Sequence, residues 1–309
     1  ILGSALFLAA CGDGEDAATS AENNTEQAES GSAQLTGNVV GDGSSTVAPI
    51  TEALVEEYAA VQKDVRVAVG VSGTGGGFEK FINGETDFSN ASRPIKDTEV
   101  EKLKAAGIDY TEFELAYDGL SVVVHPDNTW AKDLTVEQLQ KIWIEDGTKK
   151  KWSDIDASWP AEEIVFYSPG SDSGTYDYFD EVILDGEDIV KDAMLSEDDN
   201  VLVQGVIGDV NAIGYFGYAY YLENKDKLQV VTVNGVEPTN DTIESGDYSP
   251  LSRPLFIYVK NSAVKDSEAT YDFIKFTLEN AGEMAEVVGY VSLPADKYEA
   301  SLTQLESLK

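Results

Sequence analysis

The sequence predicts an α/β fold built on an open, largely parallel sheet with helices on both faces. Two kinds of sequence pattern, one typical of strands and one typical of helices, lead to this prediction. From residue 37 onward, short stretches rich in β-branched residues alternate with stretches whose apolar residues recur at helical spacing. This alternation is typical of parallel strands joined by crossover helices. The 309 residues are enough for one large or two medium domains with a sizeable core.

The first part of the body shows the clearest alternation. Strands are expected at residues 38–40, 65–71, 87–91, 113–116 and 120–124. Helices are expected at residues 47–61 and 98–106, with another beginning at 78–82. The valine-rich run VRVAVGV at 65–71 is the strongest strand signal, because β-branched side chains favour a pleated surface.

The second part contains more aromatic residues. Strands are expected at 165–168, 212–221, 228–234 and 255–260, and helices at 134–143, from Thr175, and at 267–288. The four tryptophans fall within thirty residues: Trp130, Trp143, Trp152 and Trp159. We expect them to form the core of a second lobe rather than a platform for stacking sugars or bases.

Charge and composition exclude several classes of protein. Asp and Glu number 57 against 21 Lys and Arg, which gives a net charge of −36. Binding to nucleic acid or to anionic lipid needs clustered positive charge, so neither is expected. The acidity indicates a solvated surface suited to salty surroundings. With a single histidine, His125, and a single cysteine, Cys11, we expect no disulfide, no metal centre and no cofactor.

The first residues are typical of an exported protein. Residues 1–11 contain an apolar segment that ends in Leu8-Ala9-Ala10-Cys11, which resembles the bacterial lipobox. We expect the end of a lipoprotein signal peptide here, with lipid attachment at Cys11; the alternative is a chance cysteine after an ordinary signal peptide. Residues 12–36 are acidic and lack aromatic residues, so a flexible tether is expected. The chain is therefore expected in the periplasm or at the cell surface, anchored to the membrane.

Three segments combine glycine with serine or threonine just before an expected helix. They are Gly41–Thr46, Ser72–Gly77 and Ser168–Thr175. Glycine lets the backbone approach a ligand closely, and hydroxyls and unpaired first-turn amides donate hydrogen bonds to an anion. Each segment alone is also explained by a helix cap with a tight turn. Together, at the carboxyl ends of strands in an α/β chain, they favour an oxyanion site.

Arginine, the side chain that matches a tetrahedral oxyanion in a bidentate fork, occurs three times, as Arg66, Arg93 and Arg253. Arg93 follows the expected strand 87–91, so it should lie at the carboxyl end of a strand. A surface ion pair is the alternative for Arg93.

Six motifs together resemble the PstS-type phosphate-binding proteins of bacterial ABC phosphate importers. They are GDGSSTVAPI (41–50), SGTGGGFEKF (72–81), TDFSNASRPI (86–95), AYDGLSVVV (116–124), SPGSDSGTYDYF (168–179) and IGYFGYAYY (213–221). The resemblance implies a two-lobed clamshell of the type II periplasmic-binding class, each lobe a mixed sheet flanked by helices, joined by two crossing strands. It places lobe one at 37–122 and 254–309 and lobe two at 123–253. Asp118-Gly119 and Arg253-Pro254 then lie near the crossings, where we expect hinge structure, with contact to a ligand as the alternative.

The resemblance also implies phosphate contacts, carried over by motif. They are Ser45 and Thr46 in the first segment, Thr74 in the second, and Ser173, Gly174 and Thr175 in the third. The chain departs from the family pattern at two positions. Ser92 stands where many members have an Asp that accepts the phosphate proton, and Pro169 stands where many have an Arg.

These departures raise the question of which residues compensate. Arg93 adjoins Ser92, as in a subgroup of the family, and we infer that it supplies the cation that Pro169 cannot. For the proton acceptor we expect Asp118, with Asp172 in reserve. The alternative is that Asp118 only holds the hinge backbone and Asp172 only caps a turn.

The expected function is that of a receptor. It captures inorganic phosphate, delivers it to the transmembrane permease subunits of an ABC importer, and performs no catalysis. We expect it to act as a monomer. A receptor for another oxyanion, such as sulfate, molybdate or tungstate, is the first alternative. A secreted phosphatase-like hydrolase is the second, and it would need a metal cluster or His125 as a base.

Overall fold

The computed structural model describes residues 34–171, 173–196 and 198–309. The predicted signal peptide with Cys11, nearly all of the predicted tether and Asp172 therefore lie outside the described residues. The description below concerns the body, which forms one compact unit from Gln34 to Lys309.

Most of the described strands belong to one nine-stranded sheet with the order β2-β1-β3-β11-β4-β8-β6-β7, in which β9 also pairs with β4. These strands are β1 (Gly37–Gly43), β2 (Val65–Val71), β3 (Phe88–Ala91), β4 (Tyr110–Val124), β6 (Val165–Pro169), β7 (Met194–Ser196), β8 (Ala212–Gly217), β9 (Gln229–Val230) and β11 (Ser252–Lys260). β1 pairs in parallel with β2 and β3, and β6 pairs in parallel with β7 and β8. β11 and β4 run antiparallel to their neighbours, so each half of the sheet is mixed, as the resemblance implied.

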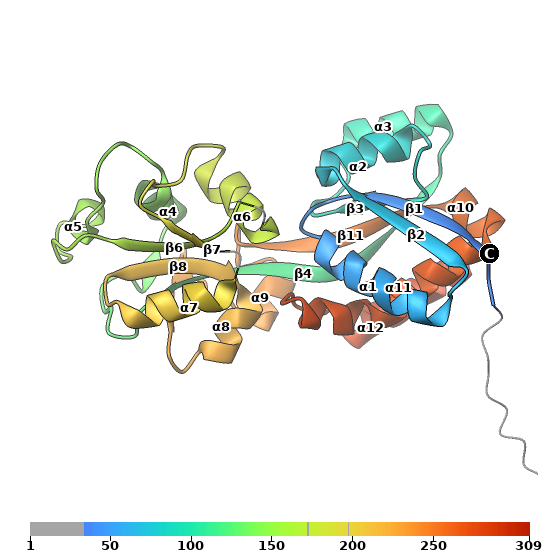
Figure 1. Ribbon diagram of the computed structural model, residues 1–309. Helices are drawn as coiled ribbons and strands as arrows, with labels where there is room; N and C mark the ends of the chain where they lie inside the picture. The colour runs from blue at the N-terminus through green and yellow to red at the C-terminus, as the bar shows by residue number, and fades with distance from the viewer. Residues whose placement is uncertain (1–33, 172, 197) are drawn as a thin grey trace, which may run out of the picture. The chain divides into compact units, whose positions relative to one another are not determined.

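Helices cover both faces of the first lobe (Figure 1). These helices are α1 (Ala48–Val61), α2 (Gly73–Ile82), α3 (Asp97–Ala106), α10 (Asn261–Asp266), α11 (Glu268–Val287) and α12 (Ala295–Glu306). On one face, Phe78 and Phe81 of α2 pack against Tyr258 of β11. On the other, Tyr58 of α1 packs against Phe273 of α11.

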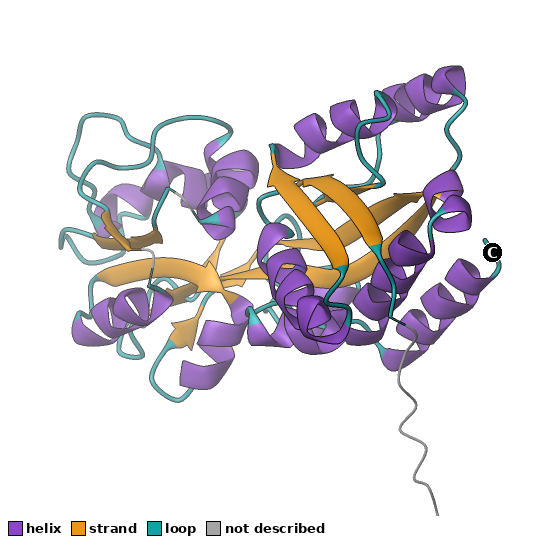
Figure 2. Cartoon of the chain, turned by 45° about the vertical axis from the view of Figure 1, so that its right-hand side comes forward, coloured by secondary structure: helices purple, strands orange, loops and turns teal. Residues whose placement is uncertain are grey.

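The second lobe also has helices on both faces of its strands (Figure 2). They are α4 (Val136–Trp143), α5 (Trp152–Ile155), α6 (Gly174–Phe179), the π-helix η1 (Asp180–Leu184), α7 (Asp199–Gly208), α8 (Tyr218–Asn224) and α9 (Asn240–Glu244). Two short strands, β5 (Asp133–Leu134) and β10 (Thr232–Val233), pair in parallel with each other outside the nine-stranded sheet. Trp143 and Trp152 are fully buried, and the other two tryptophans pack against the same cluster. The prediction that the tryptophans form the core of the second lobe is confirmed.

Two antiparallel strands, β4 and β11, join the two lobes. β4 runs without a break for 15 residues, pairing with β11 in the first lobe and with β8 in the second. The prediction of two separate strands at 113–116 and 120–124 was therefore wrong. Asp118 interrupts the apolar pattern, but it stays in the strand because Arg253 directly opposite compensates its charge. The lobe boundaries at 122/123 and 253/254 stay a prediction.

Three other expectations need correction. The stretch 228–234 is not one strand but two, since β9 pairs with β4 and β10 pairs with β5 in the separate sheet. The glycine run after Ser72 is not a loop but the start of α2, which begins at Gly73. Glycine is needed here because a Cβ on Gly77 would lie 2.5 Å from the Cα of Gly43, so the run lets α2 approach β1. The aromatic stretch 212–221 is not one strand, since β8 ends at Gly217 and the tyrosines that follow form α8.

Within residues 34–171, 173–196 and 198–309, no helix combines the length and the apolar character that a membrane crossing requires.

Candidate oxyanion site between the lobes

The first predicted segment forms a tight connection between β1 and α1. Gly43 has a φ of +149°, and a Cβ there would lie 2.1 Å from the backbone oxygen of Asn90, so the turn requires glycine. The turn buries Thr46, whose backbone N–H donates to the Ser44 hydroxyl over 3.2 Å. Tyr290, three residues beyond the end of α11, donates its hydroxyl to the carbonyl oxygen of the same residue, Thr46, over 2.8 Å. Because burial raises the pKa of Tyr290, this hydroxyl remains a donor.

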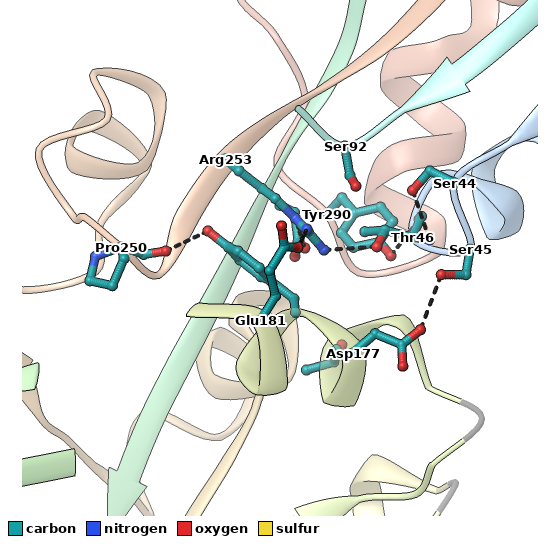
Figure 3. Close-up of polar contacts among 12 residues, drawn as sticks. Ser44, Ser45, Thr46, Ser92, Asp177, Glu181, Pro250, Arg253 and Tyr290 are labelled. Atoms are coloured by element: carbon teal, nitrogen blue, oxygen red, sulfur yellow. Dashed lines mark hydrogen bonds and ion pairs between the residues drawn. The ribbon is translucent and has the colours of Figure 1, made fainter. Parts of the chain in front are cut away.

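Arg253 of β11 is a cation on the strand pair that crosses between the lobes, opposite Asp118 (Figure 3). Its Nη2 donates to the Thr46 hydroxyl over 2.7 Å, and its Nη1 lies 3.3 Å from the Glu181 carboxylate. The guanidinium also covers the Tyr178 ring, 3.5 Å from the ring centroid. The side chain is only 10% exposed, so its charge is felt strongly at this point.

Asp118 lies across the strand pair from Arg253. Its Oδ2 is 3.3 Å from Arg253 Nε, and its side chain is 1% exposed. Among the described residues, Asp118 Oδ1 is buried without a hydrogen-bond partner. Burial raises the pKa of Asp118, and the charge of Arg253 opposes that shift. The result is a buried carboxylate with one oxygen that still needs a donor.

The third predicted segment begins α6 and reaches the first lobe. Ser173 caps the helix, its hydroxyl accepting from the Thr175 backbone N–H over 3.2 Å. Gly174 lies against the first segment, since a Cβ there would stand 3.0 Å from the Cα of Thr46. A cavity of about 400 Å³ borders this contact. Its lining includes Ser45 from the first lobe and Ser173, Gly174 and Thr175 from the second.

Two carboxylates of the second lobe reach the donors just described. Asp177 of α6 accepts a hydrogen bond from the Ser45 hydroxyl over 3.2 Å. Glu181, one turn further along in η1, contacts Arg253. Both side chains extend from this helical segment toward the first segment and Arg253 in Figure 3. Sequence reasoning named neither.

The second predicted segment supplies one hydroxyl. Thr74 lies in the first turn of α2, and its Oγ1 is 3.2 Å from the Ser92 hydroxyl and accepts from the Ser92 backbone N–H. The two predicted contacts Thr74 and Ser92 are therefore brought together at the ends of neighbouring elements.

Arg93 points to a different partner. Its guanidinium forms a bidentate pair with Glu99 of α3, at 2.8 and 2.9 Å. These hydrogen bonds are the main reason that the pKa of Arg93 is raised, while the charge of Glu181 contributes less. The structure thus satisfies the charge of Arg93 on the first lobe. We therefore assign the role of the ligand's cation to Arg253 in the proposal below.

His125, on which a hydrolase would depend, lies at the end of β4 in the second lobe. Its Nδ1 accepts from the backbone N–H of Asp127 over 3.0 Å, as in a local turn. In the described part of the chain, no three His, Cys, Asp or Glu side chains gather as they would around a metal ion.

The fold and the site between the lobes define a periplasmic binding protein of type II. The family model described as "PBP superfamily domain" matches residues 28–281. A phosphate-binding protein PstS of Staphylococcus saprophyticus is 47% identical over 99% of this chain and 92% of its own length. Another PstS, from Staphylococcus aureus, is 43% identical over 99% of this chain and 90% of its own length. The chain belongs to the PstS family of phosphate-binding proteins.

Solved structures agree with this assignment. A structure described as a possible phosphate binding protein from Planctomyces limnophilus is 44% identical, with a TM-score of 0.85, covering 89% of this chain and 99% of that one. A phosphate transport receptor from Vibrio cholerae has a TM-score of 0.63 at 24% identity, covering 83% of this chain and all of that one, and supports the fold alone.

Proposed function

We propose that the protein binds inorganic phosphate outside the cytoplasm and delivers it to the permease of an ABC importer. The family relatives are named for phosphate binding, and the site offers the chemistry that an oxyanion requires. The single observation that carries the proposal is Arg253. It is a largely buried cation at the crossing of the lobes, and it donates to the hydroxyl of Thr46, the neighbour of Ser45 in the chain.

In this proposal, phosphate lies between the two lobes. Arg253 supplies charge-assisted hydrogen bonds. Hydroxyls and amides come from both sides: Ser45, Thr46, Thr74 and Ser92 from the first lobe, and Ser173, Gly174 and Thr175 from the second. Because the contacts come from both lobes, binding favours the arrangement in which the lobes approach each other.

The lipid anchor and the tether that the sequence predicts before residue 37 complete the proposal. A lipid on Cys11 and an acidic tether at 12–36 would hold the receptor at the membrane surface, near its permease, and a monomer would suffice for this role. Both features rest on the sequence.

Titration of the phosphate-stripped protein by calorimetry tests the function. We expect saturable one-to-one binding of phosphate and weaker binding of sulfate, molybdate and tungstate. Incubation with a phosphomonoester should give no turnover. Tighter binding of another oxyanion, or hydrolysis of the ester, would replace the phosphate receptor with one of the alternatives.

We further propose that Asp118 distinguishes phosphate from sulfate. Near neutral pH phosphate carries a proton and sulfate does not. Asp118 Oδ1 is buried and lacks a donor among the described residues, so a protonated ligand within reach could supply one. Ser92, which replaces the Asp of many relatives, can donate as well as accept, and so rejects sulfate less firmly by itself.

Asp118→Asn is therefore expected to weaken phosphate binding and to improve sulfate binding relative to it. The ratio of the two affinities, measured on one preparation, is insensitive to a loss of folded protein. An unchanged ratio would show that Asp118 serves only the strand pair with Arg253.

A further inference from the structure

Two carboxylates of the second lobe contact the donors that the proposed function assigns to phosphate. Asp177 accepts from the Ser45 hydroxyl at 3.2 Å, and Glu181 lies 3.3 Å from Arg253 Nη1. The two residues are four apart, a spacing that places helical side chains on the same face. One surface of α6 and η1 thus presents two negative charges to the hydroxyl and the guanidinium of the site (Figure 3).

Asp177 and Glu181 differ from Asp118 in how far their side chains are exposed to solvent. Asp118 is 1% exposed, whereas the Glu181 side chain is 65% exposed and Asp177 is also exposed. Exposed carboxylates can return to water at little cost, and their pairs contribute little free energy. Asp118 is therefore a fixed part of the site, while Asp177 and Glu181 can leave their partners.

From this geometry we infer that Asp177 and Glu181 compete with the oxyanion for Ser45 and Arg253, and thereby limit affinity and promote release. The inference rests on the proposed function. A phosphate that takes hydrogen bonds from Ser45 and Arg253 must displace both carboxylates. After displacement, two negative charges remain close to an anion that is itself negative, and like charges at this range repel. When the ligand leaves, the carboxylates reoccupy the donors.

This device suits a protein that must give up its ligand. Donors without an internal partner would give up no hydrogen bond when the anion binds, and the anion would then be held more tightly. The competing carboxylates are on the second lobe and one of their targets, Ser45, is on the first, so the same contacts also link the lobes when the anion has gone.

The test is a comparison of phosphate affinity and dissociation rate in Asp177→Asn, Glu181→Gln and the double variant. Each change keeps the shape of an exposed side chain and removes its charge. We expect about a two- to fivefold gain in affinity for each single variant, a larger gain for the double variant, and slower dissociation. Glu187→Gln removes the same charge from an exposed position nearby, and should leave both quantities unchanged.

Whether phosphate affinity rises or falls in the variants decides whether the carboxylates compete with the ligand. Weaker binding in Asp177→Asn or Glu181→Gln would mean that the carboxylate holds the ligand, and equal binding would mean that it is a bystander. Either outcome overturns competition. An equal gain of affinity in Glu187→Gln would mean that only the overall charge matters, and it would overturn competition as well.

The unaltered protein is titrated in parallel. If it binds phosphate, the proposed function stands whatever the variants do; if it does not, both claims fail.

Discussion

Arg253→Ala is expected to weaken phosphate binding by about 2–5 kcal/mol, as for removal of one partner of a buried charge-assisted pair. The side chain is 10% exposed and donates to Thr46 at the crossing of the lobes, so water cannot readily replace it. Arg253→Lys should lose less, because it keeps the charge and gives up only the planar fork. Calorimetric titration of the stripped variants measures both effects.

Two other arginines provide controls for this prediction. Arg66 is exposed on β2, and Arg66→Ala should bind phosphate like the unaltered protein. Arg93 is paired with Glu99, so Arg93→Ala should cost much less than Arg253→Ala. Because Arg253→Ala also leaves the buried Asp118 without its partner, melting curves should accompany the titrations. If Arg253→Ala is folded and binds phosphate with undiminished affinity, or if Arg93→Ala loses more affinity, then Arg93 and not Arg253 is the cation that binds phosphate.

Gly174→Val is expected to reduce phosphate affinity by about 1–3 kcal/mol, the usual cost of forcing atoms into a packed contact. A Cβ at this position would stand 3.0 Å from the Cα of Thr46, and backbone cannot move aside as a flexible side chain can. Thr46 is further held by Tyr290 and Arg253. The added side chain should therefore keep the second lobe from approaching the first.

Gly208→Val is the matched control for this change. Gly208 ends α7, and a Cβ there would meet nothing within 4 Å. Gly208→Val should therefore leave the phosphate affinity unchanged. If Gly174→Val binds phosphate as tightly as Gly208→Val, the contact between Gly174 and Thr46 has no part in ligand binding.

The alternation of strands and helices could be read from the sequence because each element carries its own periodicity. Residues 65–71 form β2 with the predicted bounds, and the predicted helix at 47–61 differs from α1 by one residue. The predictions failed where a long-range contact overrides a local signal. Asp118 interrupts the apolar pattern of β4, so the sequence predicted a break in the strand. The partner that compensates its charge, Arg253, is 135 residues away and could not be inferred locally.

The site shows the same limit. Serine, threonine and glycine in recurring segments predicted an oxyanion site, and the family motifs pointed to Ser45, Thr46 and residues 173–175; the structure brings Ser45, Thr46 and the start of α6 together. Asp177 and Glu181 could not be found in this way, because their partners Ser45 and Arg253 are 132 and 72 residues away. Arg253 was expected near a crossing of the lobes, but its contact with Thr46, 207 residues away, could not be read from the sequence. One signal was available: the tripeptide Ser-Arg-Pro occurs at 92–94 and again at 252–254, and the second copy holds the arginine that reaches Thr46.

A crystal structure of the protein with bound phosphate tests the central claim most directly. We predict phosphate between the lobes, within hydrogen-bond distance of the Arg253 guanidinium and of donors from Ser45 or Thr46 and from the segment 173–175. The carboxylates of Asp177 and Glu181 should have moved off Ser45 and Arg253. Phosphate bound elsewhere, or bound while Arg253 makes no contact with it, would contradict the account.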